Sequence, residues 1–227
     1  MKTLAISLSF LMFALAGNVT AQSWRRGENL MFNGSFDNED DPLSGWTYNY
    51  SFLYQREATE FDSRHYEENH ERVEVLEHEG GRRNVLRLKA NPPAGTKVDG
   101  PPIPIDSDGR YRLTMYAKTS GPNVRLIIEG YMWRPGIRPH DGIPKLTELR
   151  KTFRSKPVYF GSQSDGNFSN VTGGWSRGVR EFPDKDMSRQ ALRAWERTEF
   201  AVLHVVAILG KPTGSLYIDD VVLERIE

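Results

Sequence analysis

The sequence predicts an all-β protein, an antiparallel sandwich with one long excursion between two of its strands. Several segments alternate between apolar and polar residues, which is typical of strands with one face on a core and one in water. Clusters of glycine, proline and asparagine separate these segments, and helical patterns are few. Many short strands joined by turns indicate a sandwich.

The body of the chain contains five predicted strands. They are Arg72–Glu77, Val85–Ala90, Tyr111–Lys118, Asn123–Gly130 and Glu199–Leu209. In the second of them Leu86, Leu88 and Ala90 share one face, and basic residues occupy the other. The last two segments are more continuously apolar, so we expect them to be more deeply buried.

Composition limits the class of protein. The opening segment 1–21 has a basic start, an apolar run from Leu4 to Ala16 and a small-residue end, which is the pattern of a secretory signal peptide. The rest, 22–227, has the length of a single domain. The chain has 30 basic and 30 acidic residues and no cysteine. This charge balance argues against a nucleic-acid partner, and stability must come from a core rather than from disulfides.

Two segments at opposite ends of this domain are predicted to be the first and last strands, Asn29–Asp37 and Leu216–Glu224. The long excursion between two core strands is Tyr131–Ala194, an insert rich in aromatic residues and arginine. Within it the spacing of leucines predicts short helices over Pro144–Arg154 and Met187–Trp195. Such long connections are usually functional or disordered, and aromatic content argues against disorder.

Four short motifs, in order along the chain, carry a resemblance to a known family. They are the N-terminal Asn29-Leu30 to Asp37 segment with Gly45-Trp46, then Tyr111–Lys118, Trp195–Phe200 and Tyr217–Leu223. In this order they resemble carbohydrate-binding modules of families 4, 9 and 22, which are galactose-binding-like jelly rolls. The resemblance covers about two thirds of the mature chain. It implies a jelly-roll sandwich and a carbohydrate partner, and the 131–194 insert departs from it.

The resemblance also implies a structural calcium ion between the two ends of the chain. Calcium prefers six to eight oxygen ligands. The family's ligand positions fall on Ser35, Asp37 and Asp219, with a backbone carbonyl near Arg83–Asn84. The alternative is that Asp37 caps a turn while Asp219 accepts hydrogen bonds from backbone amides of the first strand.

Sugar recognition requires aromatic faces for pyranose rings and a few placed polar groups for hydroxyls. The predicted ligand-binding residues are Trp133, Tyr131, Trp175, Tyr50, Arg134 and Glu129, with Tyr48, Tyr54 and Arg125 as further candidates. Trp133 is the foremost, because Trp-Arg-Pro-Gly places it where a strand leaves the sheet. Each of these aromatics is alternatively a core residue, and Trp46 and Trp195 are assigned to the core.

No catalytic residue is assigned. A His- and acid-rich cluster at His65–Glu71 lacks the two-histidine helix spacing of zinc hydrolases, and on a strand its histidines would face opposite sides. His140-Asp141-Gly142 is a second candidate. A nucleophile elbow and a phosphate-binding glycine loop are both missing from the sequence.

Three functions are compatible with these features. The first is a secreted, non-catalytic carbohydrate-binding protein. The second is a structural or interaction domain that has the same fold without sugar binding. The third, less favoured, is a polysaccharide lyase or hydrolase with its site in the 131–194 insert.

Overall fold

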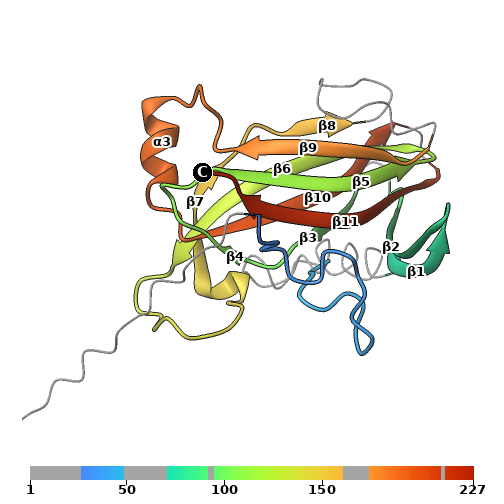
Figure 1. Ribbon diagram of the computed structural model, residues 1–227, viewed down its shortest axis with the longest axis horizontal. Coiled ribbons are helices and arrows are strands. Elements are labelled where there is room, and N and C mark those ends of the chain that lie inside the picture. Colours follow the sequence, from blue (N-terminus) through green and yellow to red (C-terminus); the bar gives the residue numbers. More distant parts are fainter. Residues whose placement is uncertain (1–26, 49–70, 92–94, 161–173, 211–212) are drawn as a thin grey trace, which may run out of the picture.

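A computed structural model describes residues 27–48, 71–91, 95–160, 174–210 and 213–227, and within them two antiparallel sheets pack face to face (Figure 1). The predicted signal peptide, Tyr50, Tyr54 and most of the His65–Glu71 cluster lie outside these residues. Within the described ranges no helix has the length and apolar character that a membrane span requires.

The regular elements are mostly strands. In chain order they are β1 (Val73–Glu79), β2 (Arg82–Lys89), β3 (Thr96–Asp99), β4 (Ile103–Pro104), β5 (Tyr111–Thr119), β6 (Pro122–Trp133), the 3₁₀ turn η1 (Leu146–Glu148), β7 (Leu149–Arg154), β8 (Val158–Phe160), β9 (Ser176–Phe182), the helix α3 (Arg189–Trp195), β10 (Phe200–Gly210) and β11 (Ser215–Arg225). The five strands predicted for the body of the chain and the predicted last strand are all confirmed, with small shifts at their ends.

One sheet has five strands in the order β1-β2-β11-β5-β9. The other has the order β3-β10-β6-β7, with β4 paired to β10 and β8 paired to β6. All pairings between named strands are antiparallel. The predicted fold class, an antiparallel sandwich, is therefore confirmed.

The core lies between the sheets, where alternate residues of each strand meet. On β5 the inward side chains include Leu113, Met115 and Ala117, and on β10 they include Leu203 and Val205, all of them buried. The residues between them point away from the core, as period-two alternation requires. Trp46 and Trp195, assigned to the core from the sequence, are 5% and 1% exposed.

The prediction of a strand over Asn29–Asp37 is wrong. This segment forms turns, and Asn33 and Phe36 have positive φ angles of 50° and 57°, which a strand does not allow. It nevertheless lies along β11. The Leu30 amide donates to the Leu223 carbonyl at 2.7 Å, and the Val221 amide donates to the Gly34 carbonyl at 2.8 Å. The two ends of the domain therefore meet, as predicted, but through a turn.

Replacing Gly34 by alanine is expected to weaken this contact. A Cβ atom at Gly34 would lie 1.9 Å from the Val221 carbonyl oxygen, so one of the two backbones must move. Forced overpacking of this kind costs about 1–3 kcal/mol, measured as a lower free energy of unfolding in urea. Gly100→Ala is the control, because its Cβ would meet atoms only at ordinary contact distances of 3.5 Å or more. Equal stability of the two variants would contradict the close approach.

The 131–194 insert adds strands to both sheets. Its first part gives β7 and β8, which pair with β6, and its later part gives β9, which pairs with β5. The helix predicted over Pro144–Arg154 is wrong, because only η1 is helical and Leu149–Arg154 forms β7. Leu149 and Phe153 are buried as strand residues, since β6 offers a strand edge for pairing.

The second predicted helix is confirmed as α3, where the Ser188 hydroxyl accepts a hydrogen bond from the Ala191 amide at 3.2 Å and caps the first turn. At the other end of the helix Trp195 packs into the core, whereas Leu192 is 45% exposed. Trp195 is therefore the one fully buried residue of α3, and Ala191 and Ala194 pack against the core at partial burial.

Candidate functional site

The outer face of the six-stranded sheet carries most of the predicted ligand-binding residues. On β6 the inward residues are Leu126 and Ile128, so Glu129, Tyr131 and Trp133 fall on the opposite, outer face. The Tyr131 hydroxyl donates to Glu129 Oε2 at 2.8 Å. Three of the predicted residues thus stand in one row on one strand.

A chain of charged side chains, the charged row, crosses the same face from β3 to β7. Lys97 Nζ lies 2.9 Å from Asp99 Oδ2, and the other oxygen of Asp99 meets His204 Nδ1. His204 Nε2 is 3.1 Å from Glu129 Oε2, and Lys151 Nζ is 2.7 Å from that same oxygen. His204 and Asp99 are direct cross-strand partners, so strand register brings them together.

The centre of the charged row, Asp99, His204 and Glu129, is buried, and these three groups stabilise one another's ionised forms. Burial alone would raise the pKa of Asp99, but the neighbouring His204 and Lys97 hold it below its usual range. Burial likewise opposes ionisation of Glu129, yet hydrogen bonds from His204 and Lys151 hold its pKa well below its usual range. Burial would lower the pKa of His204, and the two carboxylates raise it. Both ring nitrogens of His204 face carboxylate oxygens, which only accept hydrogen bonds, so the imidazole carries both protons and is a cation between two anions.

Beside the charged row lies a cavity of about 250 Å³, called the smaller cavity. Its polar lining consists of Lys97, Asp99, Tyr131, Arg134, Arg150, Lys151 and His204. Leu146 and Leu149 supply its apolar wall. An apolar wall with a few converging polar groups is the general pattern of a ligand site.

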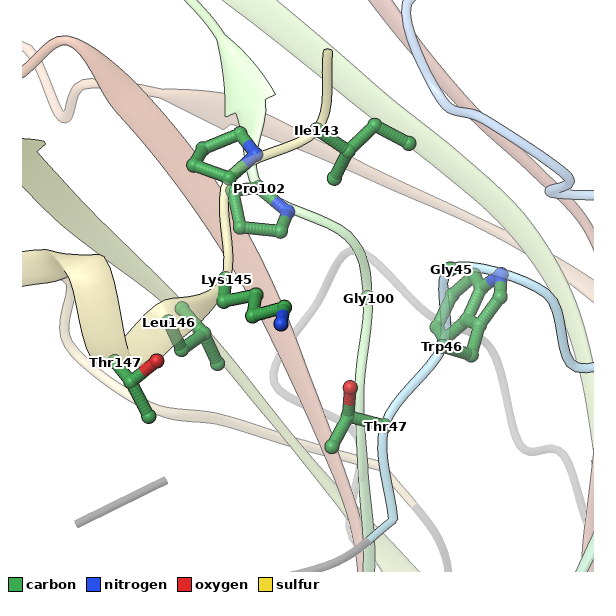
Figure 2. A pocket seen from close by; sticks show the side chains of 10 residues that line it. Gly45, Trp46, Thr47, Gly100, Pro102, Ile143, Lys145, Leu146 and Thr147 are labelled. Atoms are coloured by element: carbon green, nitrogen blue, oxygen red, sulfur yellow. The ribbon is translucent and has the colours of Figure 1, made fainter. Parts of the chain in front are cut away.

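A larger cavity of about 510 Å³ adjoins it and shares Leu146 (Figure 2). Figure 2 shows the loop of Trp46 and Thr47 facing the segment that carries Lys145 and Thr147, with Gly100 between them. The Trp46 ring is 5% exposed, so its faces are taken up by the core. The larger cavity has a mainly apolar wall, which includes Pro102, Ile143 and Leu146, and its polar groups are the Thr47 and Thr147 hydroxyls and the Lys145 amine.

The residue ranked foremost from the sequence, Trp133, stands next to the smaller cavity but outside its lining. Its ring packs edge-on against His140 and Phe200, with centroids 5.1 and 5.5 Å apart. The Asp141 carbonyl, 3.1 Å from His140 Nδ1, and Glu148, 3.3 Å from its Nε2, raise the pKa of His140. His140 is thus a surface residue that packs against the edge of the Trp133 ring.

Trp175, by contrast, packs on the five-stranded sheet. Its ring lies 5.2 Å from the guanidinium carbon of Arg82 and 5.9 Å from Lys118 Nζ. Lys118 points away from the core, since its neighbour Ala117 points inward. The structure therefore separates Trp175 from the row of Tyr131 and Trp133, while Tyr50 lies outside the described residues.

The predicted metal ligands do not converge in the described arrangement. Asp37 Oδ1 accepts from Asn84 Nδ2 at 2.5 Å, and hydrogen bonds from Asn84 and Ser35 lower the Asp37 pKa. Asp219 instead pairs with Arg82 at 2.7 Å, and burial raises its pKa.

Both oxygens of Asp219 already have donors, because its Oδ1 also accepts from the Asp220 amide at 2.7 Å. Across the residues that the structure describes, no three His, Asp or Glu side chains form a group that could hold a metal. Ser35 and Asp37 remain available as oxygen ligands, whereas Asp219 would join them only by giving up Arg82. The calcium ion stays a prediction.

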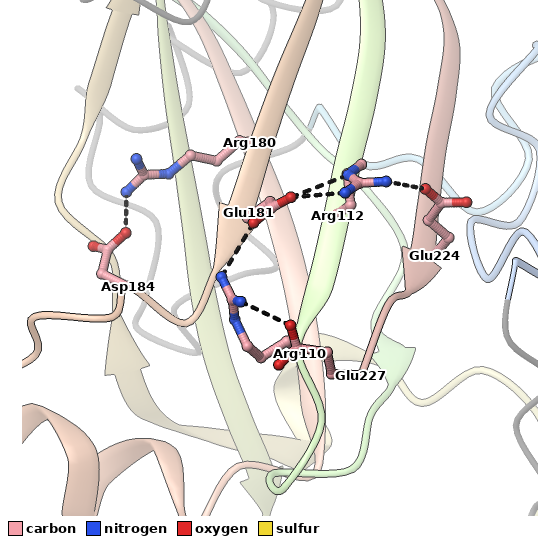
Figure 3. A network of polar contacts seen from close by, with 7 residues as sticks. All are labelled: Arg110, Arg112, Arg180, Glu181, Asp184, Glu224 and Glu227. Carbon is pink, nitrogen blue, oxygen red and sulfur yellow. Dashed lines mark hydrogen bonds and ion pairs between the residues drawn. The ribbon is translucent and has the colours of Figure 1, made fainter.

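The outer face of the five-stranded sheet carries a different polar network (Figure 3). Arg112 on β5 reaches Glu181 on β9 at 2.8 Å and Glu224 on β11 at 3.3 Å. Arg110 lies 3.1 Å from both Glu181 and Glu227. Arg112 holds the pKa of Glu181 below its usual range. These charges are matched across neighbouring strands, so the network supports sheet pairing.

His204, Asp99 and Lys97 were missed at the level of sequence. His204 stands in the middle of an otherwise apolar strand, which was a usable signal, because burying an imidazole requires partners. Asp99 and Lys97 carry no comparable signal. Their role depends on β3 lying beside β10, and no local pattern of residues 96–99 specifies that pairing.

Comparison with known proteins gives matches only at the level of fold. No family model and no curated protein matches the chain. A family 16 carbohydrate-binding module is 12% identical, with a TM-score of 0.43 over 86% of this chain and 99% of that one.

Two further matches are of the same kind. A structure described as "CBM4 structure and function" is 14% identical, with a TM-score of 0.43 over 86% of this chain and 99% of that one. A putative sugar binding protein from Bacteroides thetaiotaomicron is 13% identical, with a TM-score of 0.44 over 87% and 100%. The chain is thus similar to these structures over most of its length. Identities this low say nothing of a ligand.

Proposed function

We propose that the protein binds a carbohydrate on the outer face of the six-stranded sheet and is not itself a catalyst. The observation that carries this proposal is the smaller cavity, which brings Tyr131 together with Arg134 and the charged row. An aromatic side chain beside converging polar groups matches the requirements of a pyranose ring with hydroxyl substituents. The larger cavity next to it gives room for a neighbouring sugar residue.

The fixed positions of two side chains also support the outer face of the six-stranded sheet as the binding site. Tyr131 is held by its hydrogen bond to Glu129, and Arg134 Nε donates to the Leu149 carbonyl at 2.8 Å. Groups already held in place lose less conformational entropy on binding. Export through the signal peptide predicted at 1–21 belongs to this proposal, because it would bring the protein to extracellular glycans.

Affinity electrophoresis against a panel of neutral and acidic polysaccharides tests this function. For whichever polysaccharide retards the protein, Tyr131→Ala and Trp133→Ala are each expected to weaken binding, with Tyr131→Ala losing about tenfold or more, as removal of a central contact residue does. Trp175→Ala is the matched control, since it removes an aromatic ring from the other sheet and should leave retardation unchanged. If binding survives both β6 changes, the outer face of the six-stranded sheet is not the site.

An enzymatic function is the second candidate, favoured by the closeness of Tyr131, Glu129 and His204 to a cavity. A general base must be able to accept a proton, and both ring nitrogens of His204 already face carboxylate oxygens. This arrangement disfavours His204 as a base. New reducing ends or unsaturated products after incubation with polysaccharide would support catalysis against the binding proposal.

A further inference from the structure

Positive charge exceeds negative charge around the smaller cavity. Four cationic side chains line it, namely Lys97, Arg134, Arg150 and Lys151, and protonated His204 is a fifth. The negative charges are those of Asp99, in the lining, and of Glu129 beside it. Binding a neutral sugar does not require this excess of positive charge.

The two carboxylates are fully used within the protein. Asp99 contacts Lys97 and His204, and Glu129 contacts His204, Lys151 and the Tyr131 hydroxyl. Arg154 also lies 3.4 Å from Glu129. Neither carboxylate is therefore left to balance the arginines at the mouth of the cavity.

Arg134 and Arg150 have no ion pair with any carboxylate of the described residues. Arg134 donates through Nε to a carbonyl, and Arg150 donates to the Met132 sulfur at 3.2 Å. The planar guanidinium presents paired N–H groups that match the oxygens of a carboxylate or an oxyanion. Both arginines line the cavity, so their remaining donors are placed to receive such a group.

Resting on the proposed sugar-binding function, we propose that the smaller cavity binds an anionic sugar residue, whose acidic group meets Arg134 and Arg150. The acidic group is the carboxylate of a uronic acid or a sulfate ester, which present the same oxyanion chemistry to a guanidinium. Cationic groups near a partly enclosed, low-dielectric site attract such an anion more strongly than in open water. The adjoining larger cavity takes a neighbouring residue of the same chain.

The test compares one polymer with and without its charge. The full protein is titrated with polygalacturonate, with carboxyl-reduced polygalacturonate, with a sulfated galactan and with unsulfated galactan. The expected result is at least tenfold tighter binding of a charged polymer than of its neutral counterpart, with affinity falling as salt is raised. Which charged polymer binds more tightly distinguishes carboxylate from sulfate.

Charge-removing variants locate the effect. Arg134→Gln and Arg150→Gln are each expected to weaken binding of the charged polymer about tenfold, the size of one charged hydrogen bond lost. Arg193→Gln on α3 removes the same charge away from the cavity and should leave the affinity unchanged. Thermal unfolding measures whether each variant is still folded. Because Arg150 is exposed, Arg150→Gln is expected to leave the stability of the fold unchanged.

Two failures are distinguishable. Equal affinity for a charged polymer and its neutral counterpart, or an equal loss in Arg193→Gln, overturns the anionic ligand and leaves sugar binding in place. Absence of binding to every polysaccharide overturns the proposed function itself.

Discussion

Replacing His204 by alanine is expected to lower the free energy of unfolding by about 3–5 kcal/mol at neutral pH, the usual loss when one partner of a buried ion pair is removed. The imidazolium lies between Asp99 and Glu129, all three of them buried. Without it the two carboxylates keep Lys97 and Lys151 as cationic partners but lose the group that they share. Urea unfolding measures the loss.

The pH dependence of this loss has a definite sign. The pKa values of Asp99 and Glu129 are lowered in the folded state, so their contribution is present above their unfolded pKa and is lost as pH falls. The His204 pKa is raised, so its contribution is present below its unfolded pKa and is lost as pH rises through the folded one. The contributions of all three groups are therefore present together between these limits, from about pH 5 to about pH 6.5.

In His204→Ala the two carboxylates lose a cationic partner, so their pKa values rise. Protonating them at lower pH then removes the cost of burying two negative charges. The deficit relative to the wild type should therefore shrink from about pH 6, where all contributions of the charged row are present, to about pH 4. His78→Ala is the control, because the His78 side chain is 65% exposed and surface changes usually stay within about 0.5 kcal/mol. A deficit that is small, or the same at both pH values, would contradict the buried charged row.

Replacing Trp195 by alanine is expected to cost a similar amount, about 3–5 kcal/mol, as large-to-small changes of buried aromatics do. Trp195 is 1% exposed and packs edge-on against Phe153 and Phe182, with centroids 5.3 and 5.9 Å apart. Its Nε1 donates to the Ser107 carbonyl at 2.7 Å. The change therefore leaves a cavity between both sheets and α3 and removes a hydrogen-bond donor.

Two further variants make this expectation specific. Trp195→Phe keeps most of the ring volume and should recover much of the stability, short of the lost hydrogen bond, worth about 1 kcal/mol. Leu192→Ala, in the same helix at a residue 45% exposed, should change stability by less than about 0.5 kcal/mol. Should Trp195→Ala unfold at the same urea concentration as Leu192→Ala, the helix is not anchored by this ring.

The predicted ligand-binding set shows how far residue patterns reach. Tyr131, Glu129 and Arg134 are predicted from side-chain chemistry at the start of the insert, and the structure places them together at the end of β6. Trp175 is predicted with them because it is an aromatic residue of the same 131–194 insert. In the structure it packs near Lys118 on the other sheet, since β9 pairs with β5 and not with β6.

Alternation of apolar and polar residues determined the sandwich, because period two records which side of a strand is buried and needs no knowledge of partners. The charged row beside the smaller cavity does not follow from such local patterns. His204, Asp99 and Glu129 come from three strands far apart in the chain, and only the register of β10 against β3 and β6 makes them neighbours. Tertiary structure alone decided that contact, and also that Asp219 faces Arg82 rather than Asp37, because side-chain pairing across strands depends on which strands lie side by side.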